Sequence, residues 1–172
     1  MALNAYLKIE GIKGESQDSK HKDEIDVMSF SWGVSQSGSV IGGGGGGAGK
    51  ATHQDFSFVL KVDSSSPLLY KFLATGAHIK VATLTLQRAG KEQVDYLKYK
   101  FEDILISSFA PATDAGPAEG PAPHLGPQPH LMGADFATSG AAIRPRSVEY
   151  SVLGGDGNWV SFSFDFAENR VE

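Results

Sequence analysis

The chain contains no cysteine, and this absence excludes disulfide bonds, thiolate catalysis and cysteine-ligated metal sites. It also has no apolar stretch approaching the roughly 20 residues that a membrane-spanning helix needs. The chain has 15 Lys and Arg residues against 20 Asp and Glu residues. The resulting formal net charge of -5 argues against nonspecific nucleic-acid binding. What remains is a chain of 172 residues with 41% hydrophobic and 20% charged residues, a composition typical of one globular domain with its own core.

The first residues, MALNAYLKIEG, alternate between apolar and polar side chains as a strand does. They contain neither the basic region nor the apolar region of a secretory signal peptide. We therefore expect synthesis in the cytoplasm, no signal of the general secretory pathway and no membrane insertion.

A glycine-rich run at residues 42–50, GGGGGGAGK, looks at first like a phosphate-binding loop. That motif needs Ser or Thr after the lysine to hold magnesium, but Ala51 follows Lys50. It also needs a helix after the loop, whose N-terminus binds the phosphates. Here Phe56, Phe58 and Leu60 alternate with residues that are polar except for Val59, which indicates a strand. The sequence thus predicts a long flexible loop between two strands, no nucleotide site and no cofactor.

Alternation of apolar and polar residues predicts about seven strands in this chain. A kink or bulge near residues 102–103 is needed to keep the fifth strand in phase. We expect Met28, Phe30, Trp32 and Val34 to share one face of the second strand. The predicted strands cover residues 3–10, 26–35, 52–62, 79–88, 93–109, 146–153 and 159–166.

One helix is predicted after residues 64–67, which read Ser-Ser-Ser-Pro. Serine is a favoured N-cap and proline fits the first helical turn. An apolar stripe follows at Leu68, Leu69, Phe72 and Leu73, and Gly76 can end the helix in a left-handed conformation. The expected fold class is mainly β: a small antiparallel β-barrel or sandwich with one α-helix on its side.

Residues 111–129 differ from the rest because Pro, Ala and Gly dominate there and bulky apolar side chains are almost absent. Such composition is typical of an extended or mobile excursion. We expect a single domain over residues 1–172, with an insertion at about residues 110–144.

The histidines and acidic residues show no arrangement that predicts chemistry. His124 and His130 flank Pro127 without an acidic partner at ligand spacing, so we expect exposed histidines and no metal site. His21, His53 and His78 are scattered, and we expect them on polar strand faces or in loops. A cluster of carboxylates lies beside lysines, as on a solvated loop: Asp18, Asp23, Glu24 and Asp26. No catalytic residue is predicted.

Several short motifs in residues 11–55 carry a family resemblance. They are KGES at 13–16, His21, EIDV at 24–27, SWGVSQSGS at 31–39, GGGGGGAGK at 42–50 and the pair Gln54-Asp55. The chain resembles the hemolysin-coregulated protein (Hcp) family, the tube subunits of bacterial type VI secretion systems. The resemblance covers most of residues 1–108 and, more loosely, the last 25 or so. The segment from Ala110 to Arg144 departs from it.

This resemblance implies a small β-barrel with one helix on its side, which resembles phage tail-tube proteins. It implies homohexameric rings that stack head to tail into a hollow tube. The implied partners are other copies of the chain, a spike protein, a contractile sheath and small effectors held inside the ring. The resemblance also implies export through the same apparatus into the medium or a target cell.

The loop at residues 36–50 is long and pliable enough to reach a neighbouring subunit, because glycines let backbones approach closely. A ring needs heterologous contacts, in which one patch meets a different patch of the next subunit. The small-residue face of Ser31, Gly33 and Ser35 is a further candidate for such contacts. A plain solvent-exposed loop is the alternative. The residues expected to make subunit or ring-stacking contacts are Ser35, Gln36, Ser37, Gly38, Gly42, Gly43, Gly44, Gly45, Gly46, Gly47, Gly49 and Lys50.

A second interpretation of the same strands is a stand-alone soluble β-barrel that binds cargo or a ligand. Its core would use the same aromatic residues. Oligomeric state separates the two interpretations, because a tube subunit forms closed rings and a stand-alone barrel stays monomeric.

Overall fold

The computed structural model describes residues 3–36, 51–88, 90, 93–112, 138–168 and 170–171. In these residues ten strands and one helix follow one another along the chain. Their bounds are β1 Leu3–Ile9, β2 Ile25–Ser31, β3 Val34–Gln36, β4 Ala51–His53, β5 Phe56–Lys61, α1 Ser66–Thr75, β6 Ile79–Arg88, β7 Val94–Ala112, β8 Thr138–Leu153, β9 Trp159–Asp165 and β10 Arg170–Val171.

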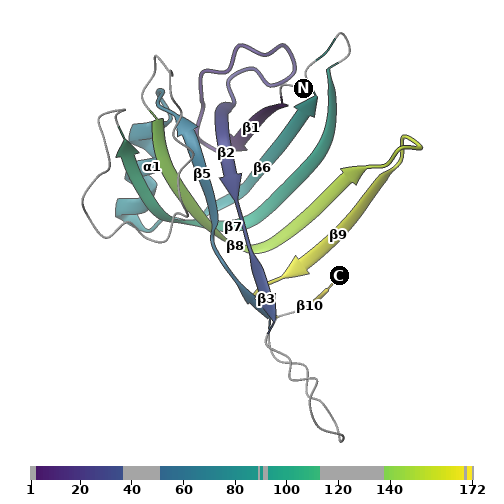
Figure 1. Cartoon of the computed structure of the whole chain (residues 1–172). Helices are drawn as coiled ribbons and strands as arrows, with labels where there is room; N and C mark the ends of the chain where they lie inside the picture. Colours follow the sequence, from purple (N-terminus) through teal and green to yellow (C-terminus); the bar gives the residue numbers. More distant parts are fainter. Residues whose placement is uncertain are drawn as a thin grey trace, which may run out of the picture.

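Six strands close into an antiparallel barrel in the order β8-β5-β2-β1-β6-β7, because β7 also pairs with β8. The expected β-barrel with one helix on its side is therefore confirmed (Figure 1). β3 and β4 form a separate two-stranded ribbon, and β9 and β10 extend the barrel sheet beyond β8. Residues 10–24, which are mostly polar, connect β1 to β2 without a regular strand, in agreement with the gap between the predicted strands 3–10 and 26–35.

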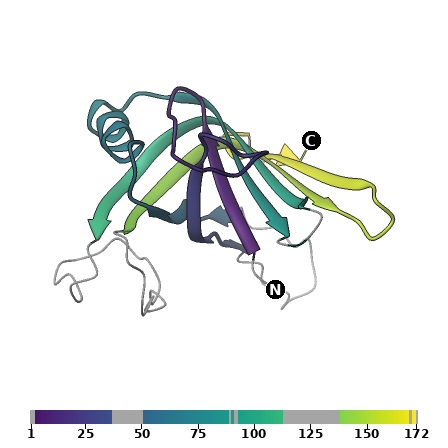
Figure 2. The same cartoon turned by 90° about the horizontal axis from the view of Figure 1, so that it is seen from above.

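β8 is the strand that joins the barrel to its extension. Its first part, Thr138–Ile143, pairs with β5, and its last part, Ser147–Leu153, pairs with β9. β7 accompanies it on the other side for nearly its whole length. Since β5 and β9 occupy the same side of β8 in turn, the β8–β9 hairpin stands away from the barrel in both views (Figures 1 and 2).

Aromatic side chains fill the barrel interior. Phe56, Phe58 and Phe101 are at most 1% exposed, and the ring of Phe101 meets those of Phe56 and Phe58 at centroid distances of 4.6 and 6.4 Å. Leu7 of β1 and Leu84 of β6 face each other in the same core. Burial of this apolar area is the main force that holds the barrel together.

The predicted face of the second strand is wrong in part. A register shift between Val27 and Ser29 places Met28 outward at 39% exposure, and β2 ends at Ser31. Val34, which begins β3, is 47% exposed. Such a bulge inserts one unpaired residue and reverses the alternation beyond it. The predicted strand over 52–62 is likewise divided into β4 and β5.

The predicted helix is confirmed. α1 has Ser65 at its N-cap position and proline in its first turn, and Gly76 ends it with a φ of 62°. No side-chain cap hydrogen bond is made at Ser65; instead the Asp63 carboxylate accepts hydrogen bonds from the Ser65 amide and hydroxyl. The helix packs beside β7, where Leu69 is buried and the Tyr70 ring approaches Phe109.

Two further corrections concern β7 and β8. The predicted strand over 146–153 is too short, since β8 begins at Thr138, inside the segment expected to be an insertion. In β7 the alternation breaks at Asp103 as predicted, because its φ is 49°, but the pairing shifts register elsewhere, between Ile106 and Ser108. Residues 113–137, including His124 and His130, lie outside the described residues, and the insertion stays a prediction.

Candidate functional site

The β3–β4 ribbon carries the two ends of the glycine-rich segment. Ser35 pairs with Thr52 and Gln36 with Ala51. The predicted arrangement of a connection between two strands is confirmed, and β4 rather than a helix follows Lys50. Ser35 is exposed. The remaining predicted contact residues lie outside the described residues: Ser37, Gly38, Gly42, Gly43, Gly44, Gly45, Gly46, Gly47, Gly49 and Lys50.

The small-residue face expected near the ribbon is only partly open. Ser31 and Ser35 are exposed, but Gly33 lies between β2 and β3, where its carbonyl accepts a hydrogen bond from the Gln54 amide at 2.9 Å. A Cβ at Gly33 would come within 2.9 Å of the Gln54 side-chain oxygen. A side chain at position 33 would therefore have to displace the side chain of Gln54.

An apolar surface that sequence reasoning missed lies on the β8–β9 hairpin. Strand alternation alone predicts one apolar face for a strand such as 159–166, without showing where the barrel ends. In the structure the side chains directly opposite one another across β7, β8 and β9 form three apolar rows. The rows are Phe101–Val148–Phe164, Tyr99–Tyr150–Phe162 and Leu97–Val152–Val160.

Exposure along these rows rises toward the tip of the hairpin. Phe101 is fully buried and Phe164 packs against the core, whereas Phe162 is 44% and Val160 69% exposed. Residues opposite one another on paired strands share a face, so the core-facing side of the sheet continues beyond the barrel. We call the exposed β9 part of this side, made by Val160 and Phe162, the hairpin face.

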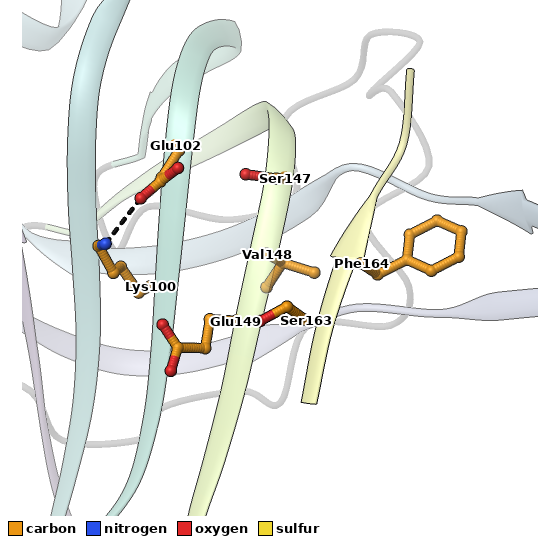
Figure 3. A pocket seen from close by; sticks show the side chains of 7 residues that line it. All are labelled: Lys100, Glu102, Ser147, Val148, Glu149, Ser163 and Phe164. Atoms are coloured by element: carbon orange, nitrogen blue, oxygen red, sulfur yellow. Dashed lines mark ion pairs between the residues drawn. The ribbon is translucent and has the colours of Figure 1, made fainter. Parts of the chain in front are cut away.

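The opposite side of the same strands is polar and slightly hollowed. A pocket of about 150 Å³ lies there, and its polar lining residues are Lys100, Glu102, Ser147, Glu149 and Ser163. Val148 and Phe164, of the first apolar row, also border it, and Figure 3 shows all seven side chains. The Lys100 ammonium lies 2.6 Å from a Glu102 carboxylate oxygen. That hydrogen bond and charge, together with the charge of Glu149, raise the pKa of Lys100.

The pocket offers no catalytic arrangement among the residues that line it. It contains two serine hydroxyls but no histidine that could act as their base. Within the described parts of the chain, no three His, Asp or Glu side chains converge as ligands of a metal ion would.

His21 lies in the loop between β1 and β2, one of the two settings expected for it, but only 6% of it is exposed. Its Nδ1 lies 2.9 Å from Glu24 Oε2 and its Nε2 3.1 Å from Asp95 Oδ1. The ring stacks on Tyr6 at 4.5 Å, and the His21 amide donates to Asp18. Part of the carboxylate cluster that we assigned to a solvated loop thus holds a buried histidine.

The same cluster shifts the pKa values of its members. Burial alone would raise the pKa of the Asp95 carboxyl, but the hydrogen bonds and charges of His21 and Lys98 hold it below its ordinary value. Burial, and then the charge and hydrogen bond of Asp18, raise the pKa of Tyr6 to about 12. These contacts fix residues 10–24 against β1 and the start of β7.

Comparison with known proteins gives this architecture its family. The sequence profile of the type VI secretion system effector family Hcp matches residues 6–132. The chain belongs to the Hcp family. The predicted family resemblance is confirmed, and the chain is a tube protein of type VI secretion. Hcp is a family of structural, secreted proteins and not a family of enzymes.

Individual relatives agree with this assignment. The chain is 46% identical over 117 residues to protein hcp1 of Pseudomonas aeruginosa, a match that covers 67% of this chain and 72% of that protein. The crystal structure of Hcp1 from Salmonella typhimurium matches with a TM-score of 0.77 and 29% identity, over 100% of both chains. A type VI secretion system effector from Yersinia pestis matches with a TM-score of 0.70 and 26% identity, over 94% of this chain and 98% of the other.

The helix content of the Hcp chain is small. In the parts that the structure describes, no helix combines the length and apolar character needed to cross a bilayer.

Proposed function

We propose that this Hcp chain assembles into hexameric rings that stack into the tube of a type VI secretion apparatus, and that the ring lumen shelters small effectors. Its partners are then other copies of itself, the spike protein, the contractile sheath and the effectors. The role is mechanical and chaperone-like, with no catalytic step. The protein is made in the cytoplasm and leaves the cell through the apparatus itself.

The proposed ring formation is inferred from the exposed hairpin face. Val160 and Phe162 continue a core-facing side beyond the barrel, where they stay 69% and 44% exposed in the described chain. An exposed apolar patch that continues the core is typical of a subunit interface. A hairpin that projects from one side suits a heterologous contact, because it reaches a different surface on the next subunit and the rotation closes a ring.

The alternative of a stand-alone binding barrel finds less support in the interior. Phe56, Phe58 and Phe101 pack against one another across the barrel, and the pocket described above lies on the polar outer side. A barrel that held a ligand inside would need that volume for the ligand.

Two neighbouring substitutions test the role of the hairpin face. Val160→Glu places a carboxylate on the apolar side of β9, whereas Ser161→Glu adds the same charge on the opposite side, where Ser161 faces Ser151 with their hydroxyl oxygens 2.8 Å apart. Both positions are exposed, so both variants should fold with the circular dichroism of the parent. In sedimentation velocity we expect Val160→Glu to be monomeric and Ser161→Glu to form rings.

Rings formed equally well by Val160→Glu would remove the hairpin face from the interface. Loss of rings in both variants would point to the added charge rather than to the apolar side, and would count equally against the proposal.

A further inference from the structure

His53 lies where two separate parts of the sheet meet. It is the last residue of β4, opposite Val34 in the ribbon, and its ring lies 4.7 Å from that of Phe164 and 4.5 Å from that of Phe166. β4 and β9 belong to different sheets. The ribbon and the β8–β9 hairpin therefore meet here through side chains: an imidazole wedged against two phenyl rings.

Both ring nitrogens of His53 are buried, and neither finds a hydrogen-bond partner among the described residues. A buried N–H or lone pair without a partner costs free energy, and a buried charge without a partner costs much more. The neutral imidazole is thus the form that this environment tolerates. Burial lowers the pKa of His53 accordingly.

The charged groups on the surrounding elements are already engaged. Asp55, beside β4, pairs with Arg144 of β8 at 2.9 Å, and Asp165 of β9 lies 3.6 Å from Arg146. Asp165 also accepts hydrogen bonds from the amides of Ala167 and Glu168, at 2.8 and 2.9 Å. Glu168, which follows β9, also has an interaction partner. Among these described residues, neither Asp55 nor Asp165 is therefore free to accept a hydrogen bond from a protonated His53.

We propose that His53 makes a pH-sensitive contact between the β3–β4 ribbon and β9. The neutral imidazole holds the ribbon against β9, and protonation of the imidazole releases the ribbon. This inference concerns the single chain and goes beyond the proposed assembly of rings.

The direction of the effect follows from proton linkage. An imidazole released into water has a pKa of about 6.5, while the docked imidazole has a lower one. Docking is therefore favoured fully above about pH 6.5 and loses stability as the pH falls toward the pKa of the docked ring. Within that window the released fraction grows by up to about tenfold for each pH unit.

The test uses the full chain and two variants. His53→Phe keeps an aromatic ring in the wedge but cannot be protonated. His78→Phe is the matched control, since the side chain of His78 is 63% exposed and pairs with Asp103 on the barrel. Amide hydrogen exchange, read by mass spectrometry, follows peptides from the ribbon at about pH 7.5 and at about pH 5, on either side of the ordinary histidine pKa of about 6.5.

Each protein is compared with His53→Phe at the same pH, because this comparison removes the intrinsic effect of pH on exchange. Relative to His53→Phe, the parent and His78→Phe should exchange faster at residues 34–36 and 51–54, and only at the acidic pH. The expected excess is about threefold or more, as a part of the roughly tenfold limit per pH unit. Residues of β6, in the core, should not differ. Equal exchange in the parent and His53→Phe at the acidic pH would overturn the proposal.

A second measurement needs no variant. Exchange of the imidazole C2 hydrogen, followed by mass spectrometry, reports the pKa of each of the five histidines of the chain. We expect a His53 pKa below the ordinary value of about 6.5. A value at or above it would show that the docked ring is not kept neutral, and would overturn the proposal even if His53→Phe failed to fold.

Discussion

Buried histidine–carboxylate contacts tie the polar loop of residues 10–24 to the barrel. Glu24 and Asp95 each lie within hydrogen-bond distance of one nitrogen of His21. Carboxylates only accept hydrogen bonds, so each contact is a hydrogen bond only if the ring nitrogen concerned carries a proton. The sequence could not predict this role, because Asp95 is 74 positions from His21 and only the fold brings them together.

The pH dependence of stability tests the Asp95 contact. The folded chain holds the pKa of Asp95 below its ordinary value, so this contact stabilises the fold above about pH 4 and loses that effect as the pH falls through the folded pKa. Asp95→Asn should lower the free energy of unfolding by about 1–2 kcal/mol at neutral pH, because a charge-assisted hydrogen bond is lost.

Urea unfolding at neutral pH and near pH 3 measures this difference, with Glu10→Gln on the exposed Glu10 as the control. The deficit of Asp95→Asn should shrink toward zero at the acidic pH. A deficit that stays constant over this range would mean that the Asp95 charge has no part in it.

At the scale of elements, period-2 alternation located most of the strands but not their interruptions. β1, β6, β9 and α1 lie close to where the sequence predicts them. The bulge at Val27/Ser29 could not be predicted, because it depends on the pairing of β2 with β5. The start of β8 was missed for another reason: residues 139–142, Ser-Gly-Ala-Ala, lie between β5 and β7, so small residues occur at successive positions and show no alternation.

Gly14 shows how tightly the loop before β2 is packed. Its amide donates to the Asp23 carbonyl at 2.8 Å, and an added Cβ would lie 2.4 Å from the Glu24 carbonyl oxygen. Gly14→Ala should therefore destabilise the fold by about 1–3 kcal/mol, since backbone must move to admit the methyl group. Thermal unfolding monitored by circular dichroism provides the measurement.

Gly155→Ala, in the β8–β9 turn, is the control for this prediction, because nothing lies within 4 Å of an added Cβ there. If the two alanine variants unfold at the same temperature, the packing assigned to Gly14 is wrong.

At the scale of the whole molecule, the long strand β8 leads from a closed barrel to an apolar face that stays partly exposed in the described chain. The sequence identified the family and the barrel through its motifs and alternation. It could not locate the hairpin face, because Val160, Phe162 and Phe164 alternate as any core strand does. Only the register with β7 and β8 shows that the first two of these residues lie beyond the barrel core.

Deletion of Gly42–Gly47 tests the predicted contact loop. These residues lie outside the described residues, and the strands that flank them, β3 and β4, pair with each other. The deletion should leave the fold and the rings intact and weaken ring stacking, because the loop is then too short to reach the next ring. Electron microscopy at matched concentration would count stacked and single rings, and stacking equal to that of the parent would exclude this role.

Molar mass in solution tests the ring proposal most directly. Size-exclusion chromatography with light scattering, followed by negative-stain images of the same peak, would measure the unmodified 18.2 kDa chain. The proposal predicts closed rings of about six subunits. A monomer that persists at high concentration would contradict it and would favour a barrel that acts alone.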